Sequence, residues 1–204
     1  GRTVSAAFVA MEQTPDPVTC NGTIVWRYRY TACDGTTTAD WTKTYTVTYS
    51  GGLIPPSNTT ETVSCPADAT NPGAPANILD ACGRTVSAAF VAMEQTPDPV
   101  TCNGTIVWRY RYTACDGTTT ADWTKTYTVT YSGGLIPPTN TTETVSCPAQ
   151  ATDPGAPANI VDACGRTVSA VLVGQDNPSP VCNGTVVWRY RYTACDGTTT
   201  ADWT

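Results

Sequence analysis

Residues 23–32 read TIVWRYRYTA, and this stretch decides the fold class of the 204-residue chain. Large apolar side chains alternate in it with polar or smaller ones, which is the two-residue period of a β-strand. The side chains expected to face a core are Ile24, Trp26, Tyr28 and Tyr30. The same stretch returns at 105–114 and, as TVVWRYRYTA, at 185–194, so it belongs to an internal repeat.

The repeat has a period of 82 residues, because Gly1–Cys82 returns as Gly83–Cys164 with only four differences. A third copy runs from Gly165 to Thr204 and has a shortened loop, VLVGQDNPSPVC, at 171–182. Self-similarity at a fixed period is the mark of a repeat array. We therefore expect the chain to be a window from a longer array that begins and ends inside a repeat.

Three further strands are predicted at 43–49, 2–10 and 61–65, each rich in Thr, Val or aromatic residues. Asp34-Gly35 is expected to close a hairpin between the 23–32 and 43–49 strands. A Gly-Gly and Pro-Pro stretch at 50–60 is expected to form the joint between domains, since Pro-Pro cannot pair in a sheet. The predicted domains are 1–50, the C-terminal part of one repeat; 51–132, a complete domain; and 133–204, a domain that lacks its last strand.

Composition places the chain outside the cell. Ten cysteines with no histidine and no Cys-x-x-Cys pair favour disulfides over zinc, and disulfides persist in extracellular proteins. The net charge of −6, with a pI near 4.4, argues against a nucleic-acid partner. The segment has no stretch expected to enter a membrane. The sequence thus predicts an all-β extracellular protein with two disulfides in each repeat.

Geometry narrows the cysteine pairing. Cys20 and Cys33 flank a straight strand, whose ends lie roughly 25 Å apart, whereas a disulfide needs Cα atoms within about 7 Å. We therefore excluded that pair and expected each repeat to close on itself, with Cys20 and Cys33 bonded upstream of residue 1. The predicted pairs are Cys65–Cys102, Cys82–Cys115, Cys147–Cys182 and Cys164–Cys195.

Four motifs together resemble a known family. They are CPA at 65–67, DACG at 80–83, CNGTIVWRYRYTACDG at 102–117 and WTKTYTVTY at 123–131. In this order they resemble the four-cysteine variant of the hyalin-repeat (HYR-like) domain, found in giant surface and gliding-motility adhesins of Bacteroidetes-type bacteria. The resemblance implies tandem immunoglobulin-like β-sandwiches, export by a type IX-like route and display at the cell surface.

No enzyme chemistry is predicted. A nucleophilic triad needs a base, usually histidine, and the carboxylates are scattered over turns and strand ends. Catalytic residues and cofactors are therefore predicted to be none. Asp34, Asp40 and Asp80 are candidate calcium ligands at one end of a domain, although a cage of 6–8 oxygens needs more carboxylates than they supply.

Three functions fit the pattern. The first is a structural stalk or filament segment of an adhesin, in which each domain adds reach of about 40 Å and its disulfides keep it from unravelling under pull, with neighbouring repeats of the chain as partners. The second makes the repeats themselves glycan- or surface-binding modules, with avidity from repetition. Its candidate contact residues are Arg27, Arg29, Arg109 and Arg111. The third is a self-assembling filament in which a domain takes a strand from a neighbouring copy.

Overall fold

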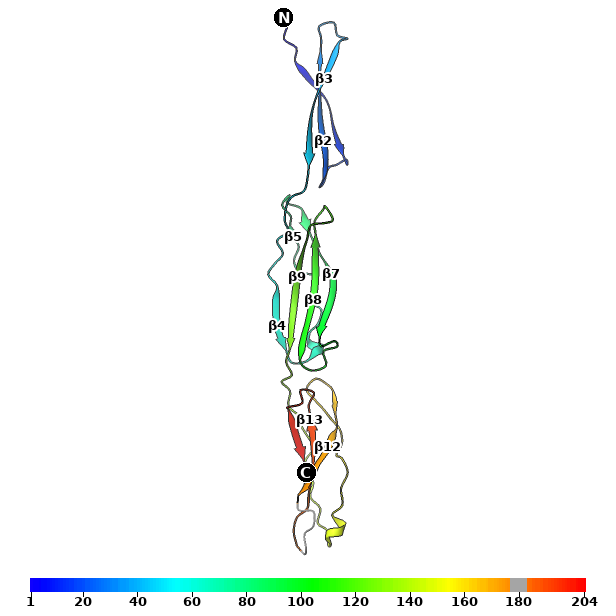
Figure 1. The fold of residues 1–204 in the computed structure, drawn as a ribbon, viewed down its shortest axis with the longest axis vertical. Helices are drawn as coiled ribbons and strands as arrows, with labels where there is room; N and C mark the ends of the chain where they lie inside the picture. Colours follow the sequence, from blue (N-terminus) through cyan, green and yellow to red (C-terminus); the bar gives the residue numbers. More distant parts are fainter. Residues whose placement is uncertain (177–182) are drawn as a thin grey trace. The chain divides into compact units, whose positions relative to one another are not determined.

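The computed structural model of the chain describes residues 1–176 and 183–204, and these residues form an all-β protein (Figure 1). The predicted all-β class is confirmed. Two short 3₁₀ turns, η1 Pro66–Asp68 and η2 Pro148–Gln150, accompany the strands. No helix in the described part is long and apolar enough to cross a membrane. Residues 177–182, which include Cys182 and half of the shortened loop, lie outside the described residues.

The middle repeat, residues 51–132, is built on a four-stranded sheet of order β4-β9-β8-β7 (Figure 1). Its strands are β4 Thr59–Val63, β7 Ala88–Thr96, β8 Gly104–Thr113 and β9 Thr120–Val129. β4 joins parallel to β9, with Thr59 opposite Lys125 and Val63 opposite Val129. β5 Ile78–Leu79 and β6 Thr85–Val86 pair as a small separate sheet.

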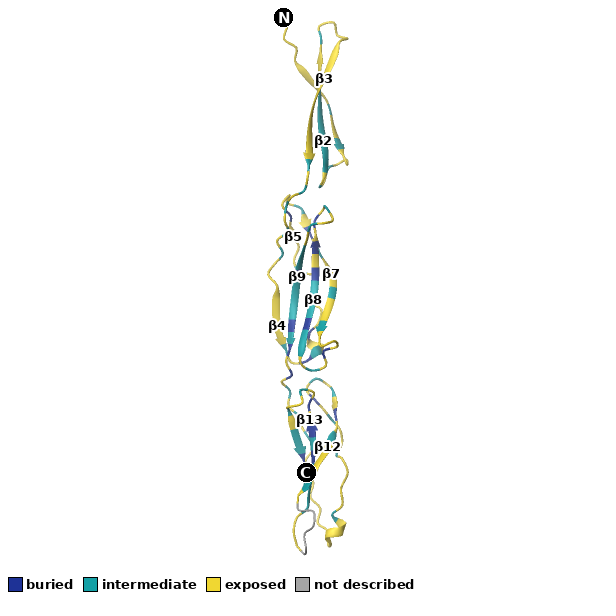
Figure 2. Ribbon diagram, viewed as in Figure 1, coloured by how far each residue is buried: buried dark blue, intermediate teal, exposed yellow. Residues whose placement is uncertain are grey.

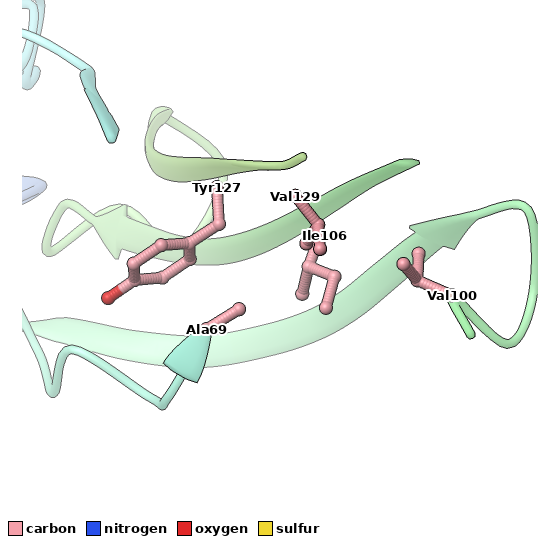
Figure 3. Close-up of a cluster of buried hydrophobic side chains, with 5 residues drawn as sticks. All are labelled: Ala69, Val100, Ile106, Tyr127 and Val129. Atoms are coloured by element: carbon pink, nitrogen blue, oxygen red, sulfur yellow. The ribbon is translucent and has the colours of Figure 1, made fainter. Parts of the chain in front are cut away.

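The alternation in the WRYRY stretch places its large side chains as predicted. Along β8, Ile106, Tyr110 and Tyr112 are buried, whereas Arg109 and Arg111 remain partly exposed (Figure 2). One core cluster joins side chains of β8 and β9 to others from the loops (Figure 3). Its members are Ala69, Val100, Ile106, Tyr127 and Val129.

Irregular chain around Ser57, Ala69 and Ala76, here called the cover, lies over the apolar face of this sheet. Three aromatic side chains of the sheet donate hydrogen bonds to it. Trp108 Nε1 donates to the carbonyl of Ala69 at 3.2 Å, and the Tyr112 hydroxyl donates to that of Ala76 at 2.6 Å. Trp123 Nε1 donates to the carbonyl of Ser57 at 3.0 Å. Buried Tyr and Trp need such partners, so these bonds fix where the cover lies.

The first repeat segment, residues 1–50, has the sheet without the cover. Its antiparallel strands are β1 Ala6–Thr14, β2 Gly22–Thr31 and β3 Thr38–Val47, in the order β1-β2-β3. Trp41 is consequently 50% exposed, whereas its counterpart Trp123 is 7% exposed. The same sequence is thus buried or exposed according to whether residues such as Ser57 pack above it.

The last repeat segment, residues 133–204, has the cover and an incomplete sheet. Its strands are β10 Ile160–Val161, β11 Thr167–Val168, β12 Ala170–Asp176, β13 Val187–Thr193 and β14 Thr200–Trp203. Residues 141–145, the counterpart of β4, form no strand. In the middle repeat β4 pairs with Lys125–Val129 of β9, whereas the larger sheet of the last repeat segment consists of β12, β13 and β14.

Strand positions differ from the predicted ones at their ends. β1 occupies 6–14 rather than 2–10, and β3 runs from 38 to 47 rather than 43 to 49. The short β5–β6 pair was not predicted, because two-residue strands have no measurable period. The hairpin at Asp34-Gly35 is confirmed: Ala32 N donates to the Thr37 carbonyl at 2.8 Å, and Gly35 adopts a φ of +72°.

By contacts the chain divides into two compact units rather than at the repeat boundaries. One comprises Gly1–Ser57, Ala74–Val91 and Tyr110–Trp123, and the other comprises Asn58–Gly73, Ala92–Arg109 and Thr124–Thr204. The first unit therefore contains the junction between the first and middle repeats. The second contains the junction between the middle and last repeats. The boundaries predicted at Ser50 and Ser132 stay a prediction.

Candidate functional site: the disulfide-linked junctions between repeats

Every disulfide in the described part joins one repeat to the next. Cys20 bonds to Cys115 across the first junction, with Cα atoms 5.8 Å apart. Cys102 bonds to Cys195 across the second junction in the same way, at 5.7 Å. The second junction also contains Cys65–Cys164, with Cα atoms 5.5 Å apart. The disulfides of the described residues therefore connect repeats and do not close them.

The predicted pairing within repeats is consequently wrong. Cys65–Cys102, Cys82–Cys115 and Cys164–Cys195 are not formed, and Cys20 bonds downstream to Cys115 rather than upstream. Within the described residues Cys33, Cys82 and Cys147 are free and exposed. The predicted Cys147–Cys182 bond involves a residue outside the described part, and the upstream partner predicted for Cys33 lies outside the chain.

The Cys82–Cys115 prediction failed because Cys82 does not open the strand that pairs with β8. That strand, β7, begins only at Ala88, and Cys82 lies in the turn between β5 and β6. Its copy Cys164 occupies the equivalent turn between β10 and β11 and bonds across the junction to Cys65. The turn therefore places this cysteine against the preceding repeat.

A buried aspartate organises this turn. The Oδ1 atom of Asp80 accepts the backbone N–H of Cys82 at 2.8 Å and that of Arg84 at 2.9 Å. Gly83 N donates to the Asp80 carbonyl, and Gly83 has a φ of +76°, which favours glycine. Asp162 repeats the arrangement with Cys164 and Arg166. The DACGR sequence is thus a turn that presents a thiol and a guanidinium group.

The arginine of that turn reaches the preceding repeat. Arg84 Nη2 lies 2.7 Å from Asp80 Oδ2, while Arg84 Nη1 donates to the carbonyl of Thr19. The guanidinium carbon lies 5.4 Å from the ring centre of Tyr49, within the range of a cation–π contact. One side chain thereby joins a buried carboxylate in its own repeat to the backbone and an aromatic ring of the other.

The second junction has the same construction. Arg166 Nη2 lies 2.8 Å from Asp162 Oδ2, Arg166 Nη1 donates to the Thr101 carbonyl, and the guanidinium lies 5.1 Å from the Tyr131 ring centre. A shallow pocket of about 250 Å³ opens beside Asp162, Arg166 and Cys195, and a similar one lies at the first junction. The contacts are therefore a property of the repeat and not of one copy.

A glycine permits the close approach at each junction. A Cβ atom on Gly133 would lie 2.3 Å from the Cβ of Ala163 and 3.1 Å from the Tyr131 hydroxyl oxygen. Gly51 is placed the same way against Ala81. Gly134, the next residue, would meet nothing within 4 Å. The two glycines of the joint thus have different roles.

Substituting the first glycine is expected to open the second junction. Gly133→Ala should lower the free energy of unfolding by about 1–3 kcal/mol, because its methyl group overlaps Ala163. Gly134→Ala is the matched control and should change it by less than about 0.5 kcal/mol. Chemical denaturation followed by tryptophan fluorescence measures both. Equal losses in the two variants would show that close packing is not the reason for the glycine.

Acid is expected to weaken both junctions. Burial opposes ionisation of Asp162, but hydrogen bonds from the Arg166 backbone and side chain and the Cys164 N–H outweigh it, so its pKa lies below the ordinary value. The same balance lowers the pKa of Asp80. A carboxyl group with a lowered folded-state pKa stabilises the fold above about pH 3.9, and this stabilisation is lost as pH falls through the folded value.

The urea midpoint should therefore fall below about pH 4, and it should fall less steeply in an Asp80→Asn, Asp162→Asn variant. At pH 7 this variant should be less stable than the parent, since the paired arginines lose their buried anions. Identical pH profiles for the two proteins would contradict the role given to these carboxylates.

The three calcium candidates are each bonded to their own neighbours. Asp34 accepts hydrogen bonds from the Thr37 hydroxyl and from the N–H groups of Thr37 and Thr36, which lower its pKa to about 2. Asp40 pairs with Arg29 at 2.7 Å, and Asp80 belongs to the junction turn. In the part of the chain that is described, no three His, Cys, Asp or Glu residues are grouped to hold a metal.

The four candidate arginines lie on the solvent face of the sheets, where each is ion-paired across neighbouring strands. The pairs are Arg27–Glu12 at 3.1 Å, Arg29–Asp40 at 2.7 Å, Arg109–Glu94 at 3.0 Å and Arg111–Asp122 at 2.7 Å. Exposed pairs of this kind contribute little stability. The paired carboxylates do, however, neutralise the positive charge of the arginines, which an acidic ligand would need for binding.

The three repeat segments match one family model. A model described as an HYR-like domain with four cysteines matches residues 1–47, 53–129 and 135–204. The chain belongs to this family. No curated protein and no solved structure shows a significant match to the chain. The HYR-like repeats and their disulfides are those of an extracellular adhesion-type module.

Proposed function

We propose that this chain is a stalk or filament segment of a secreted bacterial cell-surface adhesin, of the giant gliding-motility type found in Bacteroidetes. One observation carries the proposal: all three described disulfides connect successive repeats. A module that holds two parts of a long protein together gains resistance to separation.

The rest of the junction supports a mechanical role. Each arginine of the DACGR turn bonds to the preceding repeat, and its buried aspartate keeps the charge compensated. Because disulfides persist outside the cytosol, this construction suits a secreted protein displayed on the surface. The neighbouring repeats of the same protein are the proposed partners, and we assign the chain no catalytic activity and no cofactor.

Electron microscopy tests the proposal. Negatively stained chains should be thin rods, and a version lengthened by one 82-residue copy should be longer by about 40 Å, the length of a ten-residue strand and a joint. The reach of a stalk depends on such regular growth. Compact particles whose diameter barely changes with the added copy would overturn the proposed role.

A further inference from the structure

The strand with the WRYRY stretch has a disulfide at each end. Cys102 precedes β8 and bonds to the next repeat, whereas Cys115 follows β8 and bonds to the preceding repeat. Across the first junction, the bond from Cys115 leads to Cys20, just before β2. Across the second, the bond from Cys102 leads to Cys195, just after β13.

Strands β2, β8 and β13 are therefore linked in series, each from its start to the end of the next. The covalent connection passes from β2 through Cys20–Cys115, along β8 against the chain direction, and through Cys102–Cys195 to β13. We call this path the strand–disulfide series. It bypasses the joints, the small sheets and the irregular cover of the middle repeat.

We propose that the strand–disulfide series bears tension along the array, so that pulling loads covalent bonds instead of hydrogen-bonded sheets. A strand rises about 3.3 Å per residue and a fully stretched chain at most about 3.6 Å, so β8 can lengthen by only about a tenth. A repeat pulled through the series therefore lengthens very little before its covalent bonds carry the force. This inference rests on the proposed stalk function and gives it a mechanism.

The other disulfide has a different part. Between Gly1 and Thr204 the shortest covalent path runs through 1–20, 102–115 and 195–204, about 40 residues that extend to roughly 150 Å. Cys65–Cys164 is not on this path. Its removal should leave the maximum extension unchanged, although it also crosses the second junction.

Single-molecule stretching of the full chain, held at its two ends with free thiols alkylated, tests the series. The oxidised parent and a Cys65→Ser variant should both stop extending at roughly 150 Å. Cys102→Ser should reach roughly 370 Å, because its shortest path then runs through 1–65 and 164–204. The fully reduced chain should reach roughly 700 Å.

These outcomes separate the inference from the proposed function. If Cys102→Ser extends no further than the parent, or if Cys65→Ser lengthens the chain as much as Cys102→Ser, the series does not bear the load. Rods that grow with repeat number would still support the stalk role in that case. Compact particles in micrographs, with the extension limits as expected, would instead overturn the stalk role and leave the covalent path established.

Discussion

Cleavage at its two lysines, Lys43 and Lys125, is expected to leave the oxidised chain in one piece of 21.5 kDa. The cuts produce residues 1–43, 44–125 and 126–204. Cys20–Cys115 holds the first fragment to the second, and the two disulfides of the second junction hold the second to the third. A lysine-specific protease, used in urea after free thiols are alkylated, should therefore change the mass on a gel only after reduction.

Pairing within each repeat would give the opposite result, because all three fragments would then separate without any reductant. Variants supply the controls. Cys20→Ser should release residues 1–43 and nothing else, since among the described residues Cys20–Cys115 alone ties that fragment to the rest. Cys65→Ser alone should release no fragment, because Cys102–Cys195 still joins the second and third. Release of the third fragment from Cys65→Ser would contradict the pairing across the second junction.

Much of the fold follows from local pattern. The alternation around Trp108 predicts both a strand and its buried face, since period two has one structural meaning when aromatic and charged residues alternate. The hairpin at Asp34-Gly35 follows from turn chemistry. Strand positions are less determined: β4 pairs with Lys125–Val129 in the middle repeat, whereas the identical residues at 141–145 form no strand.

The disulfide pairing between repeats could not be predicted from the sequence of a single repeat. Excluding Cys20–Cys33 was correct, because the two lie at opposite ends of β2. The observed pairing joins the start of one strand to the end of the equivalent strand in the next repeat. Cys102, before β8, bonds to Cys195, after β13. Because the repeats are nearly identical, the spacing of the cysteines fits pairing within a repeat and pairing between repeats equally well. Only the position of Cys82 in a turn, rather than in β7, separates them.

The contacts around the disulfides were missed for a related reason. Arg84 binds a carbonyl of the preceding repeat, whereas the arginines of the WRYRY stretch pair with carboxylates of neighbouring strands. The spacing Asp-x-x-x-Arg around a Cys-Gly pair was the available signal. A glycine in the left-handed region after a cysteine indicates a turn that exposes the thiol, and an aspartate four residues before an arginine can bridge it.

Removing the disulfide at the start of β8 should cost far more stability than removing two free thiols. Cys102–Cys195 closes a loop with a sequence separation of 93 residues. In the chain-entropy model, opening a loop of that length lowers the free energy of unfolding by about 4.6 kcal/mol. A Cys102→Ser, Cys195→Ser variant should show this loss in guanidinium denaturation followed by tryptophan fluorescence, at unchanged far-ultraviolet circular dichroism.

The matched control is a Cys33→Ser, Cys82→Ser variant, because both cysteines are free and exposed. It changes the same number of thiols and should lose less than about 0.5 kcal/mol. If both double variants lose the same amount, the loss comes from the serine substitutions and not from the link between repeats. If only the first is destabilised, the link between repeats also stabilises the fold against unfolding, because it restricts the freedom of the unfolded chain.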